Sequence, residues 1–163
     1  MYGEADYDLA VIPFIQPVNG NSTAALHPAD GYFELNAYPV RSSMEAGAIL
    51  VGGSDAPVDS HDPRPFVNMA VAVTRRVPGL PALNSAQGIG IRDAIDSYTI
   101  HGARFIGRDG EAGSIEVGKS ADFIVLDRDI LKLADAGEAD RIRGTRVLST
   151  WFQGRQVYRA RPR

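Results

Sequence analysis

The chain contains no cysteine. This absence excludes disulfide bonds, thiolate zinc sites and a cysteine nucleophile. The three histidines lie far apart, at positions 27, 61 and 101, so no His-x-His pair and no His-Glu-x-x-His motif exists. A Gly-x-Ser-x-Gly motif and a phosphate-binding glycine-rich loop are also missing. A catalytic zinc normally needs three protein ligands and one open position. These residues therefore do not form a complete zinc site by themselves.

Long apolar runs and clusters of positive charge are missing as well. No run approaches the roughly 20 apolar residues that span a bilayer, and the N-terminus lacks the basic start and apolar stretch of a signal peptide. The formal net charge is -3, and the arginine-rich end at 155–163 resembles a solvated tail. These features predict a cytoplasmic protein with neither a nucleic acid nor a membrane among its partners.

The chain does have enough apolar residues for one compact domain, with 44% hydrophobic content in 163 residues. Short apolar runs alternate with helical patterns up to residue 107, which is typical of α/β architecture. After residue 107 the pattern is mainly β. We predict buried strands at 9–15 and 48–52, helices at 40–46, 66–76 and 91–105, and later strands at 123–126, 145–152 and 155–158.

Two of these predictions carry more detail. The helix at 91–105 is expected to point Tyr98 and Phe105 inward, together with Ile91, Ala94 and Ile95. Gln153 and Gly154 separate the last two strands by the length of a hairpin turn, and glycine supplies the positive φ that such turns need. The segment 131–142 is expected to be polar and at most partly helical.

Asp55 is the first candidate for chemistry, because it follows directly after the apolar run 48–52. In parallel α/β folds the active site forms where the strands end. A carboxylate there can bind a metal ion and take a proton from metal-bound water. By position alone, a structural role in the turn before Pro57 is equally compatible with the sequence.

His61 is the second candidate, in a loop close to Asp55, where it could contact substrate. Its neighbours Asp59 and Asp62 are interpreted as solvated turn residues before Pro63. His27 and His101 are interpreted as structural. His101 lies near the end of the predicted helix 91–105, where a cationic ring would suit the helix dipole.

Several passages together resemble the amidohydrolase superfamily, and most closely the branch called amidohydrolase family 3. The run 46–58, which contains Gly-Gly-Ser-Asp, resembles the final strand of that family's barrel. The passage 113–127 (Gly-Ser-Ile-Glu-Val-Gly-Lys-Ser-Ala-Asp-Phe-Ile-Val-Leu-Asp) is similar to the strand that returns into its small β domain. Residues 12–17 resemble the preceding barrel strand, and residues 150–158 resemble the terminal hairpin.

The resemblance implies the last two strand–helix units of a TIM-type (β/α) barrel in residues 1–107. Residues 108–163 would then be strands of a small composite β domain. It implies a hydrolase that acts on carbon–nitrogen bonds other than peptide bonds in small amide-like substrates. One or two divalent metals, usually zinc, would activate a water. Asp55 would be the metal ligand and catalytic proton carrier of the last strand. His61, by its position in the loop beside Asp55, is the predicted substrate-binding residue.

The resemblance also implies that this chain lacks the family's other metal ligands, which belong to earlier strands. A whole barrel takes about 250 residues, so we expect the chain to be catalytically incomplete alone. Its open strand edges would favour self-association or pairing with the missing barrel segment. Two interpretations remain: part of a metal-dependent hydrolase, or a non-catalytic truncated module that self-associates or complements a partner chain.

Overall fold

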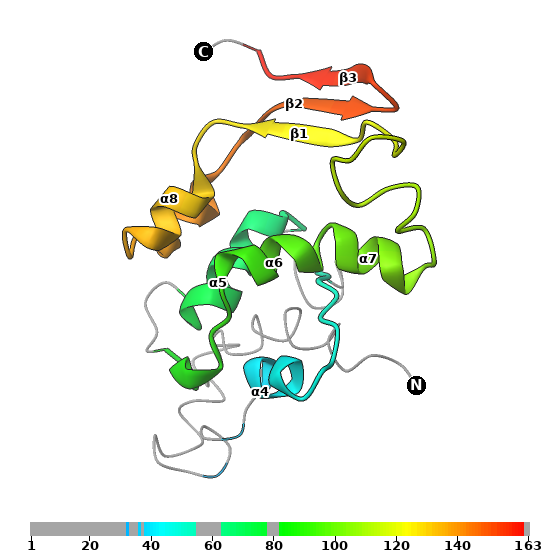
Figure 1. The fold of residues 1–163 in the computed structure, drawn as a ribbon. Helices are drawn as coiled ribbons and strands as arrows, with labels where there is room; N and C mark the ends of the chain where they lie inside the picture. Colours follow the sequence, from blue (N-terminus) through cyan, green and yellow to red (C-terminus); the bar gives the residue numbers. More distant parts are fainter. Residues whose placement is uncertain (1–31, 33–35, 37, 55–62, 78–81, 162–163) are drawn as a thin grey trace.

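The computed structural model describes residues 32, 36, 38–54, 63–77 and 82–161. A group of short helices forms one layer, and a small antiparallel sheet lies beyond it (Figure 1). The α-helices are α4 (Val40–Glu45), α5 (Pro65–Thr74), α6 (Ile91–Ser97), α7 (Ile100–Phe105) and α8 (Ile130–Asp135). Two 3-10 helices are present in the described residues: η2 (Ser85–Gln87) lies between α5 and α6, and η3 (Ala139–Gly144) lies between α8 and β2. The strands are β1 (Phe123–Leu126), β2 (Val147–Phe152) and β3 (Arg155–Arg159).

Helix α5 is the centre of the core. It begins with proline at its first turn, where the missing N–H costs no hydrogen bond. It ends at Thr74, and the next residue, Arg75, adopts a left-handed conformation with φ of 55°. Five apolar side chains of this helix are buried, together with Asn68. Ile142 of η3 is completely buried in the same core, so residues beyond 107 also pack against α5.

The predicted helix at 91–105 is in fact two helices, and this prediction was wrong. Helix α6 ends at Ser97 and α7 begins at Ile100, with Thr99 at φ -132° and ψ -98° between them. In a continuous helix the Ser97 carbonyl would accept from the amide of residue 101. It accepts instead from the backbone N–H of Gly52 at 3.0 Å. Phe105 was also predicted inward, but its side chain is 67% exposed.

The segment 48–52 was predicted as a buried strand but forms no strand. Leu50 is buried while its neighbour Ile49 is 54% exposed. A strand needs a neighbouring backbone as a partner. Within the described residues, the backbone of residues 50–53 bonds to the Ser97 carbonyl at the C-terminal end of α6 and to the side chains of Asn68, Tyr98 and His101. The predicted strand at 9–15 lies outside the described residues.

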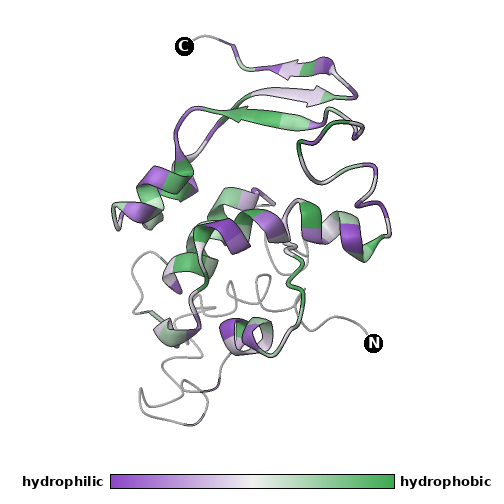
Figure 2. Cartoon of the chain, viewed as in Figure 1, coloured by the Kyte–Doolittle hydropathy of each residue, from purple (hydrophilic) through white to green (hydrophobic). Residues whose placement is uncertain are grey.

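The sheet confirms the predicted strands of the C-terminal part. Its three strands run antiparallel in the order β1-β2-β3. Strands β2 and β3 form the predicted hairpin, and Gln153 and Gly154 both have positive φ, at 49° and 74°. Phe123 and Trp151 stack across β1 and β2 with ring centroids 5.6 Å apart. Strand β1 is apolar along its length (Figure 2), yet Ile124 and Val125 remain 45% and 42% exposed.

The segment 131–142, predicted to be polar and at most partly helical, contains most of α8 and part of η3. Asp129 caps α8 by accepting a hydrogen bond from the backbone N–H of Lys132 at 3.0 Å. Ile130 and Ile142 join the core on the two sides of this segment. Within the described part of the chain, no helix has the length and apolar character needed to cross a membrane.

Candidate active site

Both predicted site residues, Asp55 and His61, lie outside the described residues, as does His27. The structure describes the chain up to Ser54 and again from Pro63. It therefore describes the backbone that leads into Asp55, and the side chains that hold this backbone. We refer to Leu50–Gly53 as the segment 50–53.

Two side chains, one from α5 and one from the turn between α6 and α7, meet at the carbonyl of Gly53, two residues before Asp55. Asn68 of α5 donates from Nδ2 to this carbonyl at 3.2 Å and to the hydroxyl of Tyr98 at 3.1 Å. The Tyr98 hydroxyl donates to the same carbonyl at 3.4 Å. Asn68 is only 4% exposed, and a buried amide is favourable only when it is hydrogen-bonded. These contacts fix the position of the Gly53 carbonyl, and so of the backbone that leads to Asp55.

The Tyr98 ring also packs against Gly52. A Cβ atom on Gly52 would lie 2.5 Å from Cε2 of the tyrosine ring, so only glycine fits there. Burial raises the pKa of Tyr98 above its ordinary value of 10.0, and the hydrogen bond from Asn68 offsets part of this effect. The phenol is therefore neutral at physiological pH and can donate to the Gly53 carbonyl.

His101 holds the other end of the segment. Its Nδ1 lies 3.0 Å from the carbonyl oxygen of Leu50. A carbonyl only accepts, so Nδ1 carries the proton in this contact. The interpretation of His101 as structural agrees with this bond. Its placement near a helix end that favours a cation was wrong, because His101 lies in the first turn of α7, where the dipole disfavours positive charge.

Metal ligands do not gather in the described part of the chain, where no group of three or more His, Asp or Glu side chains could hold an ion. The most strongly perturbed carboxylate, Asp127, is far from the segment 50–53 in the sequence and has a structural role. Arg128 binds it through Nε and Nη2, both at 2.9 Å. Arg146 adds a backbone bond at 2.9 Å and a side-chain bond at 3.1 Å. These bonds, those from Arg128 first, hold the pKa of Asp127 well below its usual 3.8.

The passage 113–127 connects α7 to the sheet, and its geometry explains its glycine and lysine. Gly113 has φ of +91°, and a Cβ there would lie 2.6 Å from Cβ of Ala103. Lys119 is 13% exposed and donates to Ser114 at 2.7 Å and to Glu116 at 3.0 Å. The hydrogen bond from Ser114, followed by those from Lys119, lowers the pKa of Glu116. This passage is structural.

Comparison with known proteins assigns the family. The sequence profile described as "Amidohydrolase family" matches residues 13–158. The chain belongs to the amidohydrolase family. Among curated relatives, this amidohydrolase chain is 38% identical to the N-substituted formamide deformylase of Arthrobacter pascens over 120 residues, which is 74% of this chain and 21% of the relative. The chain thus spans about a fifth of the length of the curated relatives it matches.

Solved structures of this fold agree with the family. An amidohydrolase from Thermotoga maritima aligns with 96% of this chain and 35% of its own, at a TM-score of 0.54 and 18% identity. An adenosine deaminase from Xanthomonas campestris, solved with bound zinc, aligns with 72% of this chain and 27% of its own, at a TM-score of 0.54 and 24% identity. At these identities the likeness concerns the fold.

Sequence reasoning missed the roles of Asn68 and Tyr98. One signal was present, because Asn68 interrupts the apolar face of its helix beside Phe66 and Met69. A buried amide in such a place indicates a specific polar partner. The partner itself, a backbone carbonyl 15 residues earlier in the chain, leaves no local pattern.

Proposed function

We propose that this amidohydrolase chain supplies the C-terminal part of a cytoplasmic, metal-dependent hydrolase acting on non-peptide carbon–nitrogen bonds. In this proposal residues 1–107 are the last two strand–helix units of a (β/α) barrel, and residues 108–163 are strands of its small β domain. Asp55 is the metal ligand and proton carrier, and His61 contacts substrate. The observation that carries the proposal is the family match, which includes the Gly-Gly-Ser-Asp run.

The relatives support the reaction class. The names deformylase and deaminase both describe reactions that break a carbon–nitrogen bond. The deaminase structure contains zinc. We therefore propose a small amide or amine as the substrate and zinc as the metal. The fixed segment 50–53 is consistent with this role, since a metal ligand must be held within a few tenths of an ångström of its place.

The described residues do not fit a complete metal site. They contain no cluster of ligands, and the whole sequence offers three histidines and no cysteine. A catalytic zinc site takes three protein ligands, so in this proposal most ligands come from outside this chain and the chain alone is inactive. No catalytic step through the metal follows from the residues described.

A chimera tests the proposal directly. We would replace the matching C-terminal fifth of the Arthrobacter pascens deformylase with this chain, and measure bound metal and hydrolysis of an N-substituted formamide. We expect Asp55→Asn to lower kcat/KM by roughly 100-fold or more, the range for loss of a positioned acid or base, and to reduce bound metal.

The matched control is Asp109→Asn, which removes an exposed carboxylate of the same type and should leave both quantities unchanged. Equal activities of the two variants would contradict the proposed role of Asp55. A second arm sequences the DNA upstream of the Met1 codon, where the proposal expects a coding segment with a His-x-His pair. Neighbouring DNA without such a segment would favour the non-catalytic module.

The non-catalytic module has its own supporting observation. Strand β3 is exposed along its whole length, and Val157 is 61% exposed on it. Exposed apolar strand edges favour pairing with another chain. If this edge mediates association, light scattering coupled to size-exclusion chromatography would show a dimer. The Val157→Lys variant would then be a monomer in the same measurement.

A further inference from the structure

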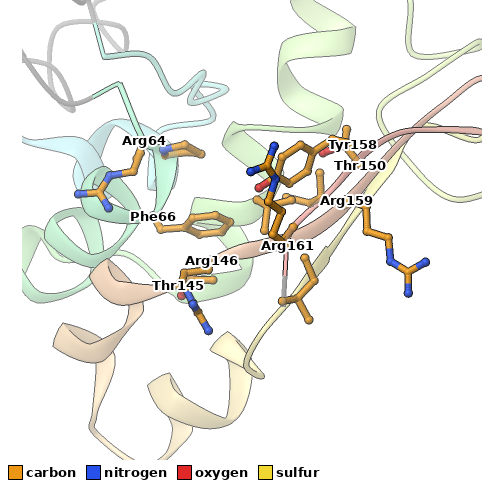
Figure 3. A pocket seen from close by; sticks show the side chains of 13 residues that line it. Arg64, Phe66, Thr145, Arg146, Thr150, Tyr158, Arg159 and Arg161 are labelled. Atoms are coloured by element: carbon orange, nitrogen blue, oxygen red, sulfur yellow. The ribbon is translucent and has the colours of Figure 1, made fainter. Parts of the chain in front are cut away.

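A groove of about 990 Å³ lies between the N-terminal end of α5 and one face of the sheet (Figure 3). Its floor is formed by Ile124, Thr150 and Tyr158, which are paired in register across the three strands. Pro65 and Phe66 form the facing wall. No residue of the segment 50–53 lines the groove.

Positive charge dominates the lining. It contains four arginines, and none of the described lining residues is acidic. Nε of Arg146 forms a salt bridge with Oδ2 of Asp127 at 3.1 Å, and Arg128 binds the same carboxylate. Within the described part of the chain, Arg159 and Arg161 form no salt bridge. In Figure 3 the Arg161 side chain lies between Phe66 and Tyr158, whereas Arg64 and Arg159 lie at opposite ends of the groove.

Helix α5 adds to this potential. Its 10 residues begin at the groove, its first turn contains no acidic residue, and no side chain caps it. The positive end of the helix dipole is therefore not compensated by a carboxylate of the first turn.

Thr145 also lines the groove and is 4% exposed. Its Oγ1 is buried and has no hydrogen-bond partner within the described part of the chain. Because this atom is buried, it does not reach an occupant of the groove, and the polar contacts of an occupant come from the arginines.

We propose that this groove binds a small carboxylate with an aromatic or branched aliphatic body. Arginine suits a carboxylate because its planar fork of N–H donors matches the two oxygens. Arg146 and Arg161 would face the charged group. Phe66, Ile124 and Leu148 provide apolar surface for the body. The volume is within the range of small-molecule sites, about 300–1,000 Å³.

The test uses the full chain, with 4-phenylbutyrate as the probe in a titration followed by amide chemical shifts. We expect shift changes centred on residues 145–150 and 158–161 and a dissociation constant on the order of 1 mM, as suits a ligand of this size. The uncharged 4-phenylbutanamide should bind about 10-fold more weakly or worse, since it lacks the charge-assisted hydrogen bonds. Equal affinity for the two probes would overturn the proposal.

Two variants localise the effect. Arg161→Gln should weaken 4-phenylbutyrate binding about 10-fold, because it removes a charge-assisted hydrogen bond. Arg155→Gln, on the same arginine-rich end but outside the lining, should leave binding unchanged. Equal effects of Arg161→Gln and Arg155→Gln would show that the groove does not take a carboxylate.

Discussion

Gly52 is the residue on which the geometry before Asp55 depends most directly. Its N–H bonds to the Ser97 carbonyl at 3.0 Å, and its α-carbon faces the Tyr98 ring at a distance that excludes a methyl group. Around Gly53, the next residue, no atom of the described part of the chain lies within 4 Å of a Cβ. Two adjacent glycines thus have different reasons to be glycine, and only the first is required by packing.

This difference gives a matched pair of variants. We expect Gly52→Ala to lower the free energy of unfolding by about 1–3 kcal/mol, the usual effect of forcing extra volume into a packed site. Gly53→Ala should change it by less than about 1 kcal/mol, because its Cβ meets nothing. Urea denaturation followed by circular dichroism measures both. Equal destabilisation by the two variants would show that Tyr98 does not pack on Gly52 in solution.

Asn68 and Tyr98 illustrate a different residue-scale property, which is polarity inside the core. Their side chains bond to each other and to one backbone carbonyl. Such a pair gives the carbonyl of Gly53 a specific position that apolar packing alone does not define. These bonds account for the polar Asn68 among the buried apolar side chains of α5.

At the scale of elements, Asp127 joins β1 to the residue that precedes β2. It accepts from Arg146 through both the backbone and the side chain, and from Arg128 next to it. These donors hold its pKa below that of the unfolded chain, so its contribution to stability is full above about pH 4. That contribution decreases as the pH falls through the lower folded value.

We therefore expect Asp127→Asn to lower the free energy of unfolding at pH 6 by about 1–2 kcal/mol, with the value reduced by the exposure of Arg146. The gap between wild type and variant should narrow as the pH is lowered from 4 to 2, because the wild-type carboxylate becomes protonated. Urea midpoints at several pH values measure this. The exposed Asp109→Asn is the control, and a gap that stays constant with pH would contradict the role of the charge.

The junction between α6 and α7 shows an element decided by a distant partner. The pattern of residues 91–105 suits one helix, and both halves are helical. The break occurs because the Ser97 carbonyl bonds to Gly52. One consequence is that His101 lies in the first turn of α7, and its Nδ1 contacts the carbonyl oxygen of Leu50.

At the scale of the whole molecule, the core lies among helices and the sheet is peripheral. Apolar residues of α5, α6 and η3 are buried together, whereas every residue of β3 is exposed. The chain therefore has a core of its own although it spans about a fifth of its curated relatives. Stability of the chain and completeness of the metal site are separate questions.

This separation leads to a prediction for the purified chain. We expect elemental analysis to find less than about 0.1 zinc per chain, since a tight site needs three protein ligands. We also expect the melting temperature to be unchanged by EDTA, because ligands that stabilise the folded state shift it only when they bind. One tightly bound zinc per chain would show that the site is complete here, and Asp55→Asn would then identify its ligand.

The sequence by itself determined the family and most local structure. Proline at the start of α5, Gly47 after α4 and the Gln153–Gly154 turn act within a few residues of their own position, so their effects are readable in the pattern. The tertiary structure decided where Ser97, Asn68 and Thr145 find partners or lack them. For Ser97 and Asn68 the partners lie 15 or more residues away in the sequence. A local sequence pattern does not show which distant group will form a hydrogen bond, or that none will, as at Thr145.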